Sequence, residues 1–371
     1  MIRLSRSIVG EKETVAASTV LGRGFLGMGP EVQLFEDELS EYVGGREVAC
    51  VNTGTAALHL ALQGLGIGPG DEVLVPSLTY VASFQAVAAT GATPVACDVR
   101  EIDGLLDLKD ARRRVTPRTR AIMLVHYASF MGDLDAAYTF ARHHGLRVIE
   151  DAAHAFGCNY NGRRIGSFGD VICFSFDGIK NITAGEGGAV VSADQKVMAR
   201  VKDARLLGVE RDSEKRYRGE RSWDFEVSAQ GWRYHMSDIM AAIGRVQLGR
   251  FESEFKPRRC QLAARYRDAL SNVAGLRLFQ NNEDGVVPHI FPLRILHASR
   301  DAVKSKLEKE GIQAGIHYKP NHLLEYFGGG QVSLPVAERL YGELLTLPLH
   351  PGISDKECDH VVDTLMSILK A

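Results

Sequence analysis

Hydrophobic residues recur along the first two thirds of the chain in two alternating patterns, one helical and one strand-like. Apolar residues at helical spacing, with proline in the first turn, predict a helix from Pro30 to Val43. Short, nearly continuous apolar runs predict buried strands. The expected strands are 47–51, 72–75, 93–97, 121–126, 147–150, 171–176 and 188–192. The helices expected between and after them are 56–65, 79–89, 134–144 and 194–206.

Strands that alternate with helices are typical of an α/β fold, a mostly parallel sheet with helices on both faces. The last third differs, because it predicts a strand at 287–296, a helix at 299–310, a strand at 312–316 and a helix at 355–369. Two helices, 237–248 and 251–270, precede it. We therefore predict a large α/β domain over 1–250 and a smaller α+β domain over 251–371.

The composition is that of an ordinary globular protein, and it excludes some classes of function. The 371 residues are 45% hydrophobic and 24% charged, with a net charge of −2. That charge excludes nucleic-acid binding by bulk positive charge. The six cysteines lack metal-knuckle or redox spacing, so no metal site is predicted. The first residues lack the apolar core of a signal peptide, and no apolar run is long enough for a membrane span, so we expect a cytoplasmic protein without membrane contact.

Candidate chemistry gathers where the predicted strands end. The first strand runs into Gly54, Thr55 and Ala56, where a helix begins and its free N–H groups can bind a phosphate, although an ordinary capped helix has the same pattern. Asp151 follows another strand at the edge where open α/β sheets bind ligands, and His154 comes one turn later. Each residue alone is also typical of a helix cap or a structural histidine.

Three further segments carry side chains that fit the same chemistry. Lys180 lies between two strands and just before the glycine-rich run 185–188, where partial burial would lower the pKa of its amine. Tyr80 follows a strand end and can stack on a planar ring. Arg233 precedes a helix and can reach a phosphate with its guanidinium fork. A solvated lysine, a packed tyrosine and a surface ion pair are the alternatives.

Together these parts match the needs of one cofactor. Pyridoxal phosphate requires a lysine that forms an imine, an acid beside its pyridine nitrogen, a phosphate-binding helix start and a flat face over its ring. The sequence also lacks the Gly-x-Gly-x-x-Gly turn of nicotinamide-binding proteins after its first strand, where Asn52-Thr53-Gly54-Thr55 stands instead. The pattern therefore favours pyridoxal phosphate over a nicotinamide.

At these motifs the sequence resembles the DegT/StrS family of sugar aminotransferases, which have the type I fold of pyridoxal-phosphate enzymes. The resemblance covers nearly the whole chain. It rests on the segments 26–30, 54–58, 69–76, 150–155, 175–176, 180–183 and 185–188, which read LGMGP, GTAAL, PGDEVLVP, EDAAHA, SF, KNIT and GEGG.

The resemblance implies a role for each candidate residue. Lys180 forms the imine with the cofactor, Asp151 pairs with the pyridine nitrogen and His154 lies beside the ring. Tyr80 stacks on the ring, while the amides of Thr55 and Ala56 and the Ser175 hydroxyl hold the phosphate. In the family, a residue of the segment equivalent to 232–234 reaches the phosphate of the partner subunit. The usual Asn-Tyr-Arg-Met is Arg233-Tyr234-His235-Met236 here, so Arg233 is the candidate and the usual arginine is absent.

The resemblance also implies the reaction. An amino group passes from an amino acid, glutamate by resemblance, to the cofactor, which takes its amine form, and then to a nucleotide-linked keto-deoxysugar for a glycan such as a lipopolysaccharide O-antigen. A sugar dehydratase with the same cofactor is one alternative, but its branch replaces the lysine by histidine and Lys180 is present. A non-catalytic regulatory protein of this fold is the other, and retention of Lys180 and Asp151 argues against it.

We also predict residues that contact the substrate and a contact between two subunits. The charged stretch 210–221 contains Arg216 and Arg218, which we expect to hold the diphosphate of the sugar nucleotide, with a solvated loop as the alternative. His317 and Tyr318 form a second candidate position for this group. Two-fold dimers are the commonest oligomers and the resemblance implies one, so we expect a homodimer with shared active sites.

Overall fold

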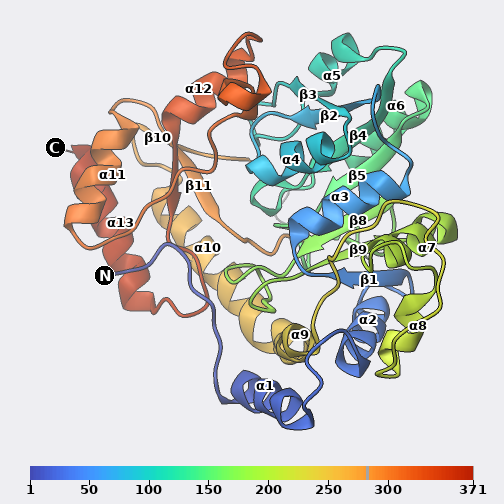
Figure 1. Cartoon of the computed structure of the whole chain (residues 1–371). Helices are drawn as coiled ribbons and strands as arrows, with labels where there is room; N and C mark the ends of the chain where they lie inside the picture. The colour runs from blue at the N-terminus through green and yellow to red at the C-terminus, as the bar shows by residue number, and fades with distance from the viewer. Residues whose placement is uncertain (281–283, 371) are drawn as a thin grey trace.

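The computed structural model describes residues 1–280 and 284–370. Its centre is a seven-stranded sheet whose strands all run parallel except β9, which is antiparallel to both neighbours (Figure 1). The strands, in their order across the sheet, are β1 (Glu47–Val51), β9 (Gly188–Ser192), β8 (Val171–Ser175), β5 (Arg147–Asp151), β4 (Thr119–Val125), β2 (Glu72–Pro76) and β3 (Thr93–Cys97).

Alternate residues of these strands enter two separate apolar cores, one on each face of the sheet. The helices over one face are α3 (Gly54–Gly64), α4 (Val81–Ala89) and α7 (Gln195–Ala204). The helices over the other are α2 (Pro30–Tyr42), α5 (Leu108–Arg114), α6 (Leu134–His144) and α9 (Asp238–Arg250). The predicted α/β class, a mostly parallel sheet covered on both faces, is confirmed.

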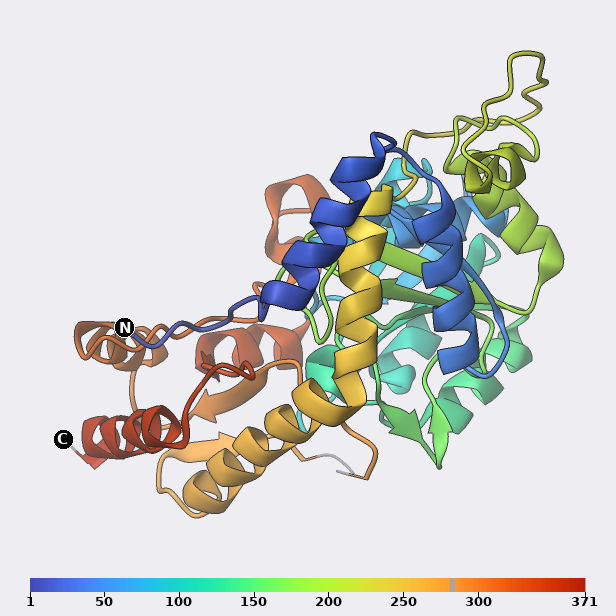
Figure 2. The same cartoon turned by 90° about the horizontal axis from the view of Figure 1, so that it is seen from below.

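Helix α1 (Glu11–Arg23) lies along α9 (Figure 2). A π-helical turn, Phe251–Phe255, joins α9 to α10 (Lys256–Leu270), so the predicted helix 251–270 is one element with an irregular first turn. After β5 the chain forms a short antiparallel hairpin of two strands, β6 (Asn159–Tyr160) and β7 (Arg163–Arg164).

The C-terminal third builds a second, antiparallel sheet in the order β10 (Leu276–Leu278), β11 (Phe291–Ile295) and β12 (Leu344–Leu347). Its helices are α10, α11 (Arg300–Lys309), α12 (Pro335–Glu343) and α13 (Asp355–Lys370). Ile2 enters the core of this unit, so both chain ends lie on the same side of the molecule (Figure 1). The division at residue 250 stays a prediction.

One prediction for local structure is wrong. Residues 312–316 form no strand, because they contact their neighbours only through single bridges at Ile312 and Gly315, and the third strand of the small sheet is β12 instead. The charged stretch 210–221 includes a short helix, α8 (Asp212–Tyr217). None of the helices in the described residues is long and apolar enough to cross a membrane.

Candidate active site

A cavity of about 440 Å³ opens at the carboxyl edge of the parallel strands. Residues just after β1, β2, β5 and β8 line it, and residues 317–318 from the C-terminal third close one wall. Of the sequence-predicted site residues, those that line this cavity are Gly54, Thr55, Tyr80, Asp151, His154, Ser175, Lys180, His317 and Tyr318. Segments far apart in the sequence therefore meet at the edge where α/β sheets bind ligands.

The turn from β1 into α3 has the form of an anion-binding cradle. Thr53 is the N-cap, and its Oγ1 accepts a hydrogen bond from the Ala56 amide at 3.0 Å. The helix begins at Gly54, where a Cβ atom would lie 2.7 Å from the Cβ of Ser175, so only glycine allows this approach. The first N–H groups of a helix lack partners within the helix. Gly54 and Thr55 face the cavity, whereas Ala56 does not line it.

Lys180 lies in the loop between β8 and β9, and its side chain is half-buried in the cavity wall. The backbone positions it, because the Lys180 amide donates to the carbonyl of Asp177 at 3.1 Å. Burial lowers the pKa of the Lys180 amine, although the nearby carboxylates of Asp151 and Asp177 act in the opposite direction. A lower pKa increases the neutral, nucleophilic fraction of the amine.

Asp151 is the last residue of β5 and is 7% exposed. Its Oδ2 accepts a hydrogen bond from the Ser83 hydroxyl at 2.7 Å, and its Oδ1 accepts one from the Ala153 amide at 3.2 Å. The carboxylate thus has a protein donor on each oxygen while it lines the cavity. The Tyr80 side chain lines the same cavity and is 59% exposed, with its ring centre 5.6 Å from that of Tyr318.

The pKa values of two histidines near Lys180 are lowered. Burial, and after it the charge of Lys180, holds the pKa of His154 well below its ordinary value and lowers that of His317 to about 4. Burial also raises the pKa of the Tyr318 phenol, whose oxygen is hydrogen-bonded to Nε2 of His154 at 3.1 Å.

The predicted arginines lie outside this cavity. The Arg216 guanidinium donates to the buried carboxylate of Asp212 at 2.7 Å, within α8. Arg218 is exposed just after that helix, and residues 218–230 stand out from the body of the molecule (Figure 2). Arg233 is also exposed and does not line the cavity. The structure of one chain therefore does not bring these three side chains to Lys180.

Sequence reasoning missed several residues that belong to the site. Asp177 and Glu186 line the cavity, and burial followed by the charge of Asp177 raises the pKa of Glu186. Glu186 lies inside the glycine-rich run that marks the site, which was a signal for it. His289 packs with its ring centre 4.5 Å from that of His154, and no motif surrounds it. Ser83 is one turn beyond Thr79 and Tyr80 at the start of α4.

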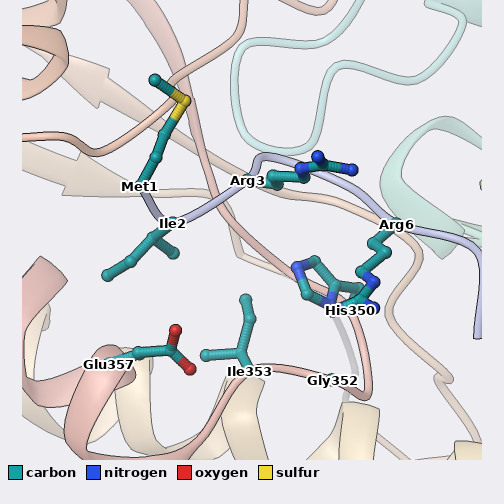
Figure 3. Close-up of a pocket in the computed structure, with 8 residues that line it drawn as sticks. All are labelled: Met1, Ile2, Arg3, Arg6, His350, Gly352, Ile353 and Glu357. Carbon is teal, nitrogen blue, oxygen red and sulfur yellow. The ribbon is translucent and has the colours of Figure 1, made fainter.

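A second cavity, of about 230 Å³, lies where the first residues of the chain meet the loop before α13 (Figure 3). Arg3, Arg6 and His350 line it together with Glu357. None of the sequence-predicted site residues lines this cavity. The side chains predicted to do chemistry are therefore gathered at the sheet edge or, for the three arginines, on the exposed segment after α7.

The fold and the first cavity define a class of protein: an α/β enzyme with an anion cradle, a lysine of lowered pKa and a buried carboxylate at the ends of parallel strands. Comparison with known proteins agrees with this class. The family model described as the DegT/DnrJ/EryC1/StrS aminotransferase family matches residues 7–366. The chain belongs to this family, as its sequence motifs predicted, and is an aminotransferase.

Individual relatives match over their full length. The chain is 35% identical to the spore coat polysaccharide biosynthesis protein SpsC of Bacillus subtilis (strain 168), over 99% of this chain and 96% of SpsC. The crystal structure of the aminotransferase TlmJ from Streptoalloteichus hindustanus is 35% identical, with a TM-score of 0.92 over 100% of this chain and 99% of TlmJ. Spr1654 from Streptococcus pneumoniae, solved in a PLP form, is 29% identical, with a TM-score of 0.91 over 100% of this chain and 98% of Spr1654.

Proposed function

We propose that this aminotransferase moves an amino group from glutamate to a nucleotide-linked keto-deoxysugar, with pyridoxal phosphate as its cofactor. One observation carries the proposal: Lys180, with its lowered pKa, shares a cavity of about 440 Å³ with the Asp151 carboxylate and the Gly54 cradle. The product is a building block for a glycan, as in lipopolysaccharide or O-antigen synthesis. The name of SpsC, a spore coat polysaccharide biosynthesis protein, supports this direction.

The residues present fit the cofactor. The cradle needs glycine twice, because a Cβ on Gly54 would meet Ser175 and a Cβ on Gly188 would lie 2.5 Å from the Thr53 carbonyl oxygen. This close approach leaves the start of α3 and the Ser175 hydroxyl available to a phosphate. Asp151 supplies the negative charge for a pyridinium nitrogen, and the exposed face of Tyr80 suits a planar ring.

When bound, the cofactor supplies an electron sink for the α-carbon of the amino acid. The chain supplies the rest. The Lys180 amine would hold the cofactor covalently and, once freed by the incoming substrate amine, would move a proton at the α-carbon. Its lowered pKa favours both roles, because an ammonium group can neither attack nor accept a proton. His154, whose pKa is lowered by burial and whose Nε2 is hydrogen-bonded to the Tyr318 hydroxyl, would lie beside the ring.

We further propose that the enzyme is a homodimer and that the partner's copy of the 210–235 segment completes each site. In one chain Arg218 and Arg233 are exposed and away from the cavity, so their charge is available to another copy. The backbone holds the end of this segment firmly, since the Asn52 amide donates to the Tyr234 carbonyl at 2.7 Å. Arg233 can donate to a phosphate and Arg218 to the substrate diphosphate. Arg216, His317 and Tyr318 remain candidates for substrate contact.

A two-stage experiment tests the function. The purified protein is reconstituted with pyridoxal phosphate and its visible spectrum recorded, which should show a Schiff-base band that glutamate converts to the amine form. A panel of nucleotide-linked keto sugars with glutamate is then read by mass spectrometry. An amino sugar confirms the proposal. Loss of water without gain of nitrogen indicates the dehydratase, and no cofactor band contradicts the enzymatic proposal.

A further inference from the structure

Two buried hydroxyl groups are linked to the Asp151 carboxylate by hydrogen bonds. Ser83, in the first turn of α4, donates its hydroxyl to Oδ2 of Asp151 at 2.7 Å. The hydroxyl oxygen of Thr79, which precedes α4, lies 3.1 Å from that of Ser83. Ser83 is 0% exposed and Thr79 2% exposed, so bulk water does not compete for these bonds. Neither residue lies in the motifs that identify the family.

The direction of both hydrogen bonds follows from the number of protons. An ionised carboxylate only accepts, and a hydroxyl has one proton to donate. Because the Ser83 proton goes to Asp151, the Thr79 hydroxyl must donate to Ser83. The Ala153 amide occupies the other carboxylate oxygen at 3.2 Å. The plane of the Asp151 carboxylate is thus determined by donors on both of its oxygens.

A residue from the C-terminal third of the protein holds Thr79, the first of the two hydroxyl donors, in place. The side-chain amide of Asn321, which is fully buried, donates to the carbonyls of Ser77 at 3.1 Å and Thr79 at 2.8 Å. Asn321 follows directly on the segment that contributes His317 and Tyr318 to the cavity. Thr79 therefore cannot shift independently of that wall of the site.

We propose that Ser83 and Thr79 are positioning residues, which hold the Asp151 carboxylate in the orientation in which it meets the pyridine nitrogen of the cofactor. This inference rests on the proposed function of Asp151. A side chain that is already oriented loses no rotational freedom when the ligand binds, so the hydroxyl pair should increase cofactor affinity. It should also keep the nitrogen protonated, because a misaligned carboxylate makes a weaker charged hydrogen bond.

The test compares Ser83→Ala and Thr79→Val with a matched control, Ser192→Ala. Ser192 is equally buried and its hydroxyl donates to the Asp170 carbonyl at 2.8 Å, at the opposite end of the sheet. The readouts are the Kd of the apo-enzyme for pyridoxal phosphate and the ¹⁵N chemical shift of the ring nitrogen in holoenzyme loaded with labelled cofactor. We expect the Kd to rise about tenfold in Ser83→Ala and about threefold in Thr79→Val, with Ser192→Ala unchanged.

Two further variants make every outcome decisive. Thr79→Ser keeps the hydroxyl donor and should therefore have the wild-type Kd. Comparison of Thr79→Ser with Thr79→Val also tests the proposal if Ser83→Ala does not fold. Asp151→Asn should weaken binding and move the ¹⁵N shift towards the unprotonated value. If Asp151→Asn has these effects and the hydroxyl variants match Ser192→Ala, the positioning role is wrong while the proposed function stands. If Asp151→Asn is itself silent, the proposed function of Asp151 fails.

Discussion

The cradle at the sheet edge and the charged segment 210–235 differ in how the chain holds them. At the sheet edge Thr53 follows β1 and Asp151 ends β5, and each has a hydrogen-bonded neighbour, the Ala56 amide for Thr53 and the Ser83 hydroxyl for Asp151. In the charged segment Arg216 is committed to Asp212, while Arg218 and Arg233 face solvent. The difference fits our proposal that one chain supplies the cradle, Lys180 and Asp151, while a second copy adds positive charge for the phosphate groups.

The largest expected effect is on Lys180. Lys180→Ala should abolish turnover, a loss of at least about 10⁴-fold, because no other lysine among the described residues lines the cavity. The cofactor itself should still bind through the cradle, so the variant separates binding from chemistry. The measurements are single-turnover kinetics with glutamate and trapping by borohydride. A variant that transaminates near the wild-type rate would show that Lys180 is not the covalent residue.

Complementation tests whether the two regions come from different copies. Lys180→Ala and Arg233→Ala are each expected to be poorly active alone. A mixed dimer should contain one site with an intact lysine and an intact arginine from its partner, so mixing should restore a large fraction of one site's activity. Activity of the mixture is measured after subunit exchange, with mass photometry to establish the oligomeric state. A fully active monomer would contradict the shared site.

Closing the cradle should weaken cofactor binding. Gly54→Ala places a Cβ 2.7 Å from the Cβ of Ser175, and overpacking of this kind costs about 1–3 kcal/mol, which is roughly five- to 150-fold in Kd if the whole cost falls on binding. Gly249→Ala is the matched control, because a Cβ there has nothing within 4 Å. Absorbance titration with pyridoxal phosphate measures both. Equal affinities in the two variants would mean that the turn before α3 does not hold the phosphate.

Reversing charge in the exposed segment should affect only the sugar substrate. Arg218→Glu combined with Arg221→Glu should raise KM for the sugar nucleotide about tenfold and leave KM for glutamate unchanged, since only the former carries a diphosphate. Arg216 is unsuitable for this test, because its reversal would also leave the buried Asp212 without its ion-pair partner. Unchanged KM values for both substrates would place the diphosphate elsewhere, with His317 and Tyr318 as the next candidates.

The smallest effect concerns stability. Burial lowers the pKa of His350 to about 4, below the value of about 6.5 expected in the unfolded chain. Between these values the unfolded state binds a proton that the folded state does not. The free energy of unfolding should therefore fall as pH decreases below about 6.5, by about 1 kcal/mol per pH unit for this group. Tm measured from pH 7.5 to 5.5 should fall less steeply in His350→Asn than in wild type. The exposed control His360→Asn should match wild type.

Much of the large sheet could be predicted from the sequence, because each of its elements carries its own periodic pattern. Strands 47–51, 93–97 and 188–192 and helix 134–144 have the predicted bounds. A run of buried residues in a parallel strand is apolar throughout, and a glycine or an acid directly after it marks the carboxyl edge. Asp151 and Gly54 could be selected as candidates by this reasoning, and Lys180 by its place between two strands and before the glycine-rich run 185–188.

Other features depend on contacts between residues far apart in the chain, which no local pattern encodes. Residues 312–316 have a strand-like composition, yet β12 pairs with β11 in their place. Ser83 and Asn321 look like ordinary polar residues until α4 and the 317–321 segment bring them to Asp151 and Thr79. The sequence by itself therefore determined the sheet and the family, and it selected the side chains that we propose to react. Only the tertiary structure decided how Asp151 is oriented, since that depends on donors contributed by distant segments.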